Sequence, residues 1–152
     1  MLNVVRWYRT SRLLCRWHVP IFPRVIDYAI RLVFSCWLPH TVKAGNNLIL
    51  GYGGLGVVIH SDAVIGDNVH IDQGVTIGGN GTVSGVPRIE SNVYIGAGAK
   101  LLGPIKIGEG SVVGANAVVL RDIPPRSLVV GVPAKIIRSD IDIETFLYHR
   151  RK

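Results

Sequence analysis

The dominant pattern in the chain is an aliphatic residue at every sixth position through its central part. These positions are Ile59, Ile65, Ile71, Ile77, Val83, Ile89, Ile95, Leu101, Ile107, Val113 and Val119. An α-helix repeats its buried face every ~3.6 residues and a flat strand every ~2 residues, so neither element produces this period. A chain that turns a corner every six residues, with one side chain pointing inward per corner, does produce it. The pattern therefore predicts a parallel β-helix built from hexapeptides.

Two other positions of the hexapeptide fit this prediction. The residue after the inward aliphatic is often glycine, which adopts corner backbone angles without steric cost; examples are Gly66, Gly78, Gly96, Gly108 and Gly114. The residue two places before it is small or branched, as at Val57, Ala63, Val69, Val75, Val93, Ala99, Ser111 and Ala117. Three hexapeptides make one triangular coil, and coils stack at about 4.8 Å. Each coil therefore depends on its neighbours for a continuous interior.

The segments before the repeat have other patterns. Residues 1–38 are predicted to form one or two helices, broken near Pro20 and Pro23, with a second amphipathic stretch at about 24–37. Pro39 ends that stretch, since the residue before a proline avoids the helical region. Apolar pairs flank a glycine-rich middle in residues 41–58, which predicts an irregular entry to the β-helix.

The repeat is interrupted once and then ends. Residues 78–88 are rich in glycine and proline, which predicts a loop protruding from a corner although Val83 keeps the register. After Val119 the register stops at Pro124 and Pro125, and a strand-like stretch follows at 129–137. We therefore expect an all-β fold, with a helical segment at 1–38, a parallel β-helix domain at 39–138 and a C-terminal helical tail at 139–152.

Composition supports a compact cytoplasmic protein. Hydrophobic residues make up 48% and charged residues 18% of the 152 positions, which argues against a disordered chain. Cys15 and Cys36 lie in apolar surroundings without zinc-site spacing, as expected for reduced, buried thiols. The apolar stretch 25–38 contains Asp27 and is too short to span a bilayer. No apolar run followed by small residues marks a cleavable signal peptide.

Basic residues are concentrated at the N-terminus, although the whole chain has a net charge of +7. The N-terminal segment contains Arg6, Arg9, Arg12, Arg16, Arg24 and Arg31, interleaved with Trp7, Tyr8, Trp17 and Tyr28. Such a segment fits a solvated or oligomer-packing helix face, or a peripheral contact with the inner membrane surface. Both interpretations stay open, and a nucleic-acid partner is not expected.

Four motifs together resemble the hexapeptide-repeat acyltransferase superfamily. They are VTIGG (75–79), IGAGAKLLG (95–103), GANAVVLRDIPP (114–125) and VVGVPAKII (129–137). The chain is most similar to serine acetyltransferases and to O-acetyltransferases of bacterial surface-polysaccharide pathways. This resemblance implies a left-handed β-helix, a homotrimer with active sites between subunits, and acetyl-CoA as the donor. The period alone shows neither the handedness nor the trimer nor the co-substrate.

The resemblance also implies residues for the donor site. Ala97 in IGAGA and Ala115 in VGANA match positions at which the pantetheine arm meets the backbone, with Leu120 and Arg121 beside them. Lys135 and Arg138 match positions that meet the nucleotide phosphates. Small side chains let a thin ligand approach backbone N–H groups, and cations satisfy phosphate charge. Without any role in binding, the two alanines could be present only because the corners are tight, and Lys135 could be a cation exposed to solvent.

The catalytic base is where the chain departs from the family. Serine acetyltransferases usually have a histidine in a context like LDHATG, but Tyr52 and Gly53 lie near that position here. Val86 takes the place of a second family histidine, and Leu38 takes the place of an aspartate.

A base must take the acceptor hydroxyl proton, and histidine suits that role near neutral pH. We expect His60 to be this base, because it occupies a corner position where glycine predominates, and Asp62 could orient it. His40 and His70 are the alternatives. His18 and His149 lie outside the repeat and are expected to be structural or solvated.

The main functional prediction is O-acetylation of a sugar hydroxyl, because a short basic, aromatic-rich N-terminus suits a glycan or lipid-linked acceptor. L-Serine is the runner-up acceptor, and a non-catalytic β-helix scaffold is a further alternative. A zinc-dependent carbonic anhydrase needs three imidazoles at one metal, whereas only His60 and His70 lie well inside the repeat. No metal is expected.

Overall fold

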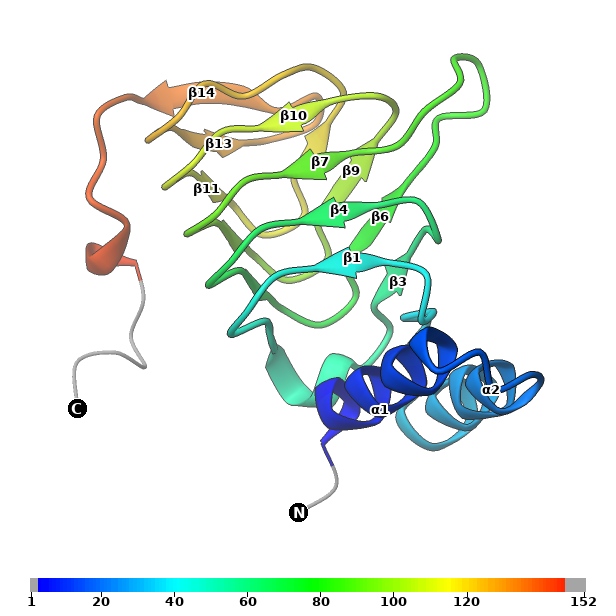
Figure 1. Ribbon diagram of the computed structural model, residues 1–152. Helices are drawn as coiled ribbons and strands as arrows, with labels where there is room; N and C mark the ends of the chain where they lie inside the picture. The colour runs from blue at the N-terminus through cyan, green and yellow to red at the C-terminus, as the bar shows by residue number, and fades with distance from the viewer. Residues whose placement is uncertain (1–2, 147–152) are drawn as a thin grey trace.

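The computed structural model describes residues 3–146 and contains three stacked faces of short parallel strands. The β1 sheet contains β1 (Lys43–Ala44), β4 (Val64–Ile65), β7 (Arg88–Ile89) and β10 (Lys106–Ile107). The β2 sheet contains β2 (Ile49–Leu50), β5 (His70–Ile71), β8 (Tyr94–Ile95), β11 (Val112–Val113), β13 (Leu128–Val130) and β14 (Lys135–Arg138). The β3 sheet contains β3 (Val58–Ile59), β6 (Thr76–Gly78), β9 (Lys100–Leu102) and β12 (Val118–Val119). From β1 to β12, successive strands visit the three sheets in turn, and the predicted parallel β-helix is confirmed (Figure 1).

The hexapeptide pattern corresponds to the interior of this β-helix. Ten of its eleven aliphatic positions are at most 2% exposed, and the small or branched positions two places earlier are also buried. Val83 is the exception, with 57% exposure. Ile59 pairs with Ile77, three hexapeptides further along, whereas Ile65 pairs with Ile89, which lies four hexapeptides further along. The loop that contains Val83 therefore adds one hexapeptide to its coil, so the sequence period continues while this hexapeptide leaves the wall.

The entry to the β-helix is irregular, as the sequence predicts. A short 3-10 element spans Gly51–Gly54, and Tyr52 inside it adopts a left-handed backbone conformation at φ 49°. Trp37 already bridges to Val58, so the first coil begins slightly before the expected boundary at 39. The division of the chain at 38/39 and 138/139 stays a prediction.

Two helices, α1 (Val4–Arg16) and α2 (Phe22–Phe34), pack against each other at the N-terminal end of the β-helix (Figure 1). The expected break near the prolines is confirmed, with Pro23 in the first turn of α2. This helix ends at Phe34, before the expected residue 37, because Ser35 adopts a left-handed conformation. None of the helices in the described part of the chain is long and apolar enough to cross a membrane.

The strand-like stretch 129–137 is not one strand. β13 and β14 pair antiparallel, and the turn between them contains Gly131 at φ 97°. Of the expected helical tail, residues 139–146 contain only the 3-10 turn Ile143–Thr145, and the rest lies outside the described residues.

Candidate active site

The β3 sheet is bordered by two edges that hold most of the predicted site residues. We call the corner between the β2 and β3 sheets, where Ala97 and Ala115 stack, the alanine edge. The N–H of Asn116 donates to the carbonyl of Ala97 at 2.8 Å, which holds successive coils together there. We call the opposite border the histidine edge. The strand register aligns His60 with Gly78, Leu102 and Leu120 along this edge.

The alanine edge has the shape that a thin ligand needs. A Cβ on Gly96 would lie 2.7 Å from the backbone nitrogen of Ala115, so only glycine allows the coils to approach this closely. Ala115 is exposed and Ala97 is half-buried, so both backbones are reachable from outside. The pair is therefore open to an extended ligand, and its contact with the pantetheine arm of coenzyme A, which the resemblance implies, stays a prediction.

The predicted phosphate-binding cations do not all meet at this edge. Lys135 pairs with Val130 at the end of β14 that lies towards the alanine edge. Arg138 pairs with Leu128 at the other end, about 10 Å further along the strand. Arg121 follows Leu120 on the histidine edge. The structure thus places Lys135 with the alanines and places Arg121 and Arg138 elsewhere on the chain's surface.

His60 lines a shallow cavity of about 360 Å³ on the histidine edge. Trp37, Pro39, Thr76 and Gly78 form part of its wall, and the protruding loop leaves the β-helix directly after Gly78. The side chain of His60 is 44% exposed, so it is open to a ligand. Its outward position at a corner agrees with the sequence-based expectation.

The hydrogen bond from Asp62 to His60 determines which ring nitrogen of His60 carries the proton in the neutral form. The backbone N–H of Asp62 donates to Nδ1 of His60 at 3.2 Å, and the Asp62 carboxylate is 3.9 Å from the same nitrogen. With Nδ1 accepting, the neutral ring carries its proton on Nε2. To accept a proton through Nε2, His60 must first exchange this tautomer. Asp62, with 79% exposure, is too loosely placed to hold the other tautomer.

His70 lies in a polar cluster beside the alanine edge. Its Nε2 is 3.2 Å from Oδ1 of Asp72, and Tyr94 donates its hydroxyl hydrogen bond to Oδ2 of Asp72 at 2.5 Å. The rings of His70 and Tyr94 meet edge to face at 5.3 Å. Burial, followed by the contact with Asp72, raises the pKa of Tyr94 to about 12, so the phenol stays neutral.

Sequence reasoning missed this cluster. The spacing of His70 and Asp72 around one inward residue was a signal that both point outward. The contribution of Tyr94 required the coil register, which pairs it with His70 on the neighbouring coil.

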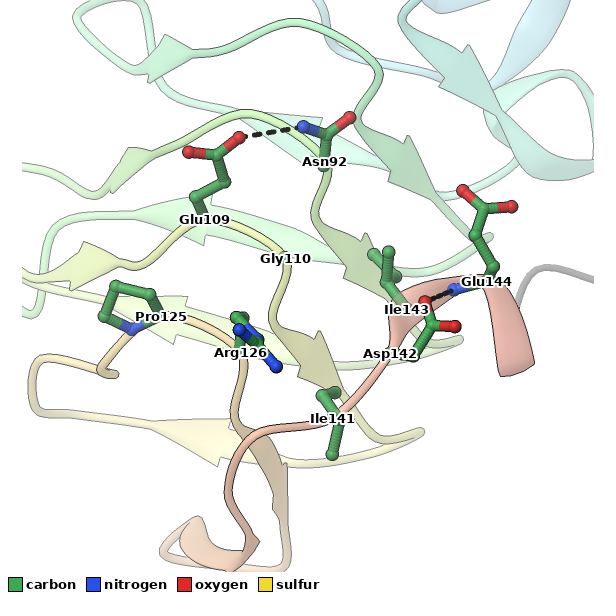
Figure 2. A pocket seen from close by; sticks show the side chains of 9 residues that line it. All are labelled: Asn92, Glu109, Gly110, Pro125, Arg126, Ile141, Asp142, Ile143 and Glu144. Carbon is green, nitrogen blue, oxygen red and sulfur yellow. Dashed lines mark hydrogen bonds between the residues drawn. The ribbon is translucent and has the colours of Figure 1, made fainter.

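The hollow shown in Figure 2 lies between the coils and the C-terminal segment and has a volume of about 410 Å³. Glu109, Asp142 and Glu144 supply carboxylates to its lining, and Arg126 is the one basic residue that lines it within residues 3–146. It contains none of the predicted site residues and is poorly suited to phosphates. Across residues 3–146, three or more His, Cys, Asp or Glu side chains nowhere form a group that could hold a metal ion.

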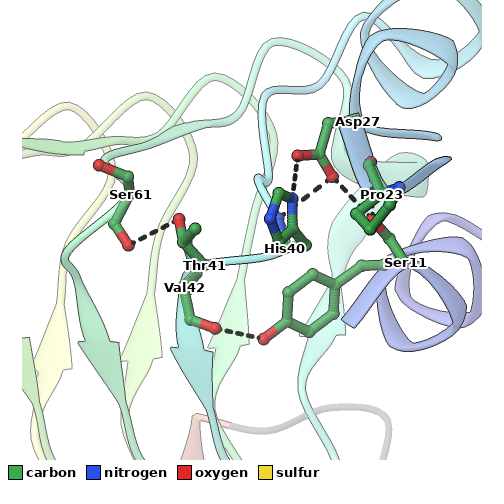
Figure 3. Close-up of polar contacts among 8 residues, drawn as sticks. Ser11, Pro23, Asp27, His40, Thr41, Val42 and Ser61 are labelled. Carbon is green, nitrogen blue, oxygen red and sulfur yellow. Dashed lines mark hydrogen bonds and ion pairs between the residues drawn. The ribbon is translucent and has the colours of Figure 1, made fainter. Parts of the chain in front are cut away.

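His40 connects the helices to the first coil, between Pro39, which lines the His60 cavity, and Thr41, which donates a hydrogen bond to the carbonyl of Ser61 (Figure 3). Its Nδ1 lies 2.6 Å from Oδ2 of the buried Asp27, which also accepts a hydrogen bond from Ser11. Only 14% of the His40 side chain is exposed, so its ring is less open to a ligand than that of His60. His18 is exposed in the turn between the helices, and His149 lies outside the described residues.

Comparison with known proteins connects this geometry to one group of enzymes. Residues 87–121 match the bacterial transferase hexapeptide family of six repeats. A serine acetyltransferase of Synechococcus elongatus is 39% identical over 140 residues, covering 90% of this chain and 57% of the relative. One from Staphylococcus aureus is 50% identical over 119 residues, covering 77% of this chain and 55% of the relative. The chain spans little more than half the length of these relatives.

Solved structures agree. Soybean serine acetyltransferase complexed with serine has a TM-score of 0.82 and 40% identity, covering 88% of this chain and 56% of that one. The Brucella abortus serine acetyltransferase in complex with coenzyme A has a TM-score of 0.85 and 35% identity. This match covers 91% of this chain and 56% of that one. These matches support the left-handed form of the β-helix. The chain is therefore a serine acetyltransferase-like member of the hexapeptide-repeat acyltransferase superfamily.

Proposed function

We propose that the protein is an acetyl-CoA-dependent O-acetyltransferase with L-serine as its first candidate acceptor. The observation that carries this proposal is the similarity to a serine acetyltransferase across 90% of the chain. Sequence reasoning ranked a sugar acceptor first. The named relatives, and a neighbouring structure that contains serine, favour the runner-up instead.

The reaction requires one proton transfer and one bond exchange. The acceptor hydroxyl oxygen attacks the thioester carbonyl carbon while a base takes the hydroxyl proton. The C–S bond then breaks, and coenzyme A leaves as a thiol after its sulfur receives the proton. We assign the base role to His60, whose ring is exposed in a cavity beside the protruding loop. Ala97, Ala115 and Lys135 would hold the donor.

The separation of the two edges supports an active site shared between copies of the chain. Within one copy, the β3 sheet lies between His60 and the alanine edge. A second copy could bring its histidine edge against the alanine edge of the first, as in the homotrimer that the resemblance implies. In this arrangement, Leu120 and Arg121 of one copy would approach the donor bound to the other.

A sugar hydroxyl remains the second candidate acceptor, on a specific observation. Tyr52 and Gly53 occupy the entry corner where serine acetyltransferases usually have a histidine, and Tyr52 is 83% exposed there. Val86 replaces the second family histidine, so the acceptor pocket differs chemically from that of the relatives.

The test is an acceptor screen with radiolabelled acetyl-CoA. L-Serine, L-homoserine and a panel of free and lipid-linked sugars are incubated with the protein, and O-acetyl product and free thiol are both measured. Serine-dependent thiol release equal to product formed supports the proposal. Acetylation of a sugar alone would reverse the acceptor ranking. Binding of acetyl-CoA without turnover of any acceptor would indicate a non-catalytic scaffold.

A further inference from the structure

The helix α2 is apolar on the side that points away from the rest of the molecule. Its buried side contains Pro23 and Ile30. On the opposite side, Phe22, Val25 and Leu32 are exposed by 62%, 55% and 83%. A helix on the surface of a globular protein ordinarily has polar residues at these positions. The exposed side of α2 therefore has the composition of a contact surface.

The turn between the two helices extends this surface. Trp17 is 67% exposed and Ile21 is 74% exposed, and Figure 1 shows the turn projecting beyond the first coil. The helical apolar face consists of Trp17, Ile21, Phe22, Val25, Tyr28, Leu32 and Val33, each more than half exposed. A contiguous exposed apolar area of this kind marks a site of interaction with a protein or a membrane.

The charges around the helical apolar face are almost all positive. Residues 3–34 contain six arginines and one acidic residue, Asp27, which is buried and bonded to His40. Arg6, Arg16 and Arg24 are exposed, and none of them is within salt-bridge distance of a carboxylate among residues 3–146. The helices thus present arginine with no exposed carboxylate beside it.

We propose that the helical apolar face binds the surface of a membrane containing anionic lipids. Helices that lie in the membrane interface combine an apolar face containing Trp, Phe and Leu with basic residues at its border. Trp and Tyr side chains favour the headgroup region, where Trp17 and Tyr28 would lie. The exposed arginines are complementary to anionic headgroups. This binding is independent of acetyl transfer and goes beyond it.

The same charges disfavour a protein occupant. If two copies met through this face, their arginines would be brought together without carboxylates to neutralise them, and like charges repel. The chain as a whole has a net charge of +7, and residues 3–34 supply +5 of it through six arginines and one aspartate. An anionic lipid surface can bury the apolar side chains and also pair the arginines with its negatively charged headgroups.

The test is co-sedimentation of the full chain with vesicles. Phosphatidylcholine vesicles are compared with vesicles of phosphatidylcholine and phosphatidylglycerol, at low and high salt. We expect binding only to the anionic vesicles and weaker binding at high salt. Arg16→Gln and Arg24→Gln should each weaken binding about fivefold. Phe22→Ser and Leu32→Ser should each weaken it about tenfold or more.

Matched control variants lie on the β-helix. Arg88→Gln removes an exposed arginine and Val83→Ser removes an exposed apolar side chain, and neither should change vesicle binding. The changed helical positions are all exposed, so the variants should keep their unfolding temperature. Absence of binding to anionic vesicles at low salt would overturn the proposal, as would equal binding to both vesicle types. A smaller assembly by analytical ultracentrifugation for Leu32→Ser, without vesicle binding by the parent, would assign the face to protein contact instead.

Discussion

The Nδ1 atom of His40 lies 2.6 Å from Oδ2 of Asp27, and this contact joins α2 to the first coil of the β-helix. The backbone N–H of His40 and the hydroxyl of Ser11 both donate to Oδ1 of the same carboxylate, each at 3.1 Å. One buried carboxylate therefore ties both helices to the point where the β-helix begins. The helical segment and the first coil should consequently unfold together.

We expect Asp27→Ala to lower the free energy of unfolding by about 3 kcal/mol, because it leaves two largely buried donors of His40 without their acceptor. The Ser11 hydroxyl keeps the carbonyl of Pro23 as its acceptor. Urea denaturation followed by circular dichroism measures this change. Asp62→Asn is the control, since 79% of that side chain is exposed, and it should change stability by less than about 0.5 kcal/mol. A loss below about 1 kcal/mol for Asp27→Ala would mean that the helices dock through their apolar contacts alone.

The β-helix could be predicted from the sequence because its period is a direct consequence of its geometry. Each corner turns after one hexapeptide, so Ile59 and Ile77, three hexapeptides apart, had to lie in the same column of the interior. Leu101 joins this column only because the loop adds a hexapeptide between it and Ile77. Val83 shows the limit of that reasoning. Its loop lengthens the coil by one whole hexapeptide, so spacing alone cannot distinguish a position in the wall from one in a protruding loop, although the surrounding glycines and proline could.

The polar clusters were harder to predict because they depend on contacts between distant segments. Asp27 meets His40 only because α2 ends at Phe34 and places its first turns beside the first coil. Tyr94 meets Asp72 only because the inserted loop lengthens that coil by one hexapeptide and so sets the local register. Neither contact can be deduced from the spacing of residues along the sequence. His60, by contrast, could be found because it breaks a local rule that favours glycine.

The donor site is tested by charge reversal. We expect Lys135→Glu to raise the KM for acetyl-CoA about 10-fold or more with a smaller change in kcat, because a charge-assisted contact with phosphate becomes a repulsion. The effect of Arg138→Glu should be smaller, since that residue lies at the far end of β14. Steady-state kinetics and calorimetric binding of coenzyme A measure both variants. Arg88→Glu is the control on another sheet, and an equal effect there would indicate general electrostatics.

The two cysteines should differ in reactivity. Burial raises the pKa of the Cys36 thiol to about 12, so it stays protonated at pH 8, whereas Cys15 is exposed. Ellman's reagent should titrate one thiol in the native protein and two in denaturant, and Cys15→Ser should remove the native reaction. Because the ordinary pKa of a thiol is 9.0, the unfolded state loses its proton first. Stability should therefore fall as the pH rises above about 9. Rapid labelling of Cys36 in the native protein would contradict the expected difference in reactivity.

The catalytic base is tested by comparing His60 with the histidine beside the alanine edge. His60→Ala should lower kcat/KM at least about 100-fold, the usual size of a lost acid–base contribution. His60→Gln separates two roles, because the glutamine amide can donate a hydrogen bond but cannot take a proton. If His60 acts as the base, Gln should be as inactive as Ala. Activity of His60→Gln within about tenfold of the parent would instead assign His60 to hydrogen-bond donation from Nε2, the tautomer that the Asp62 N–H favours.

The matched variants are His70→Asn and Tyr94→Phe. Tyr94→Phe removes the hydroxyl that binds Asp72 and keeps the ring against His70. If His60 is the base, both variants should stay within about threefold of the parent in kcat/KM. A loss of about 100-fold in His70→Asn, with a smaller loss in Tyr94→Phe and normal turnover in His60→Ala, would transfer the role to His70. Asp72 would then be the carboxylate that positions it, on the same edge of the β3 sheet as Ala97 and Ala115.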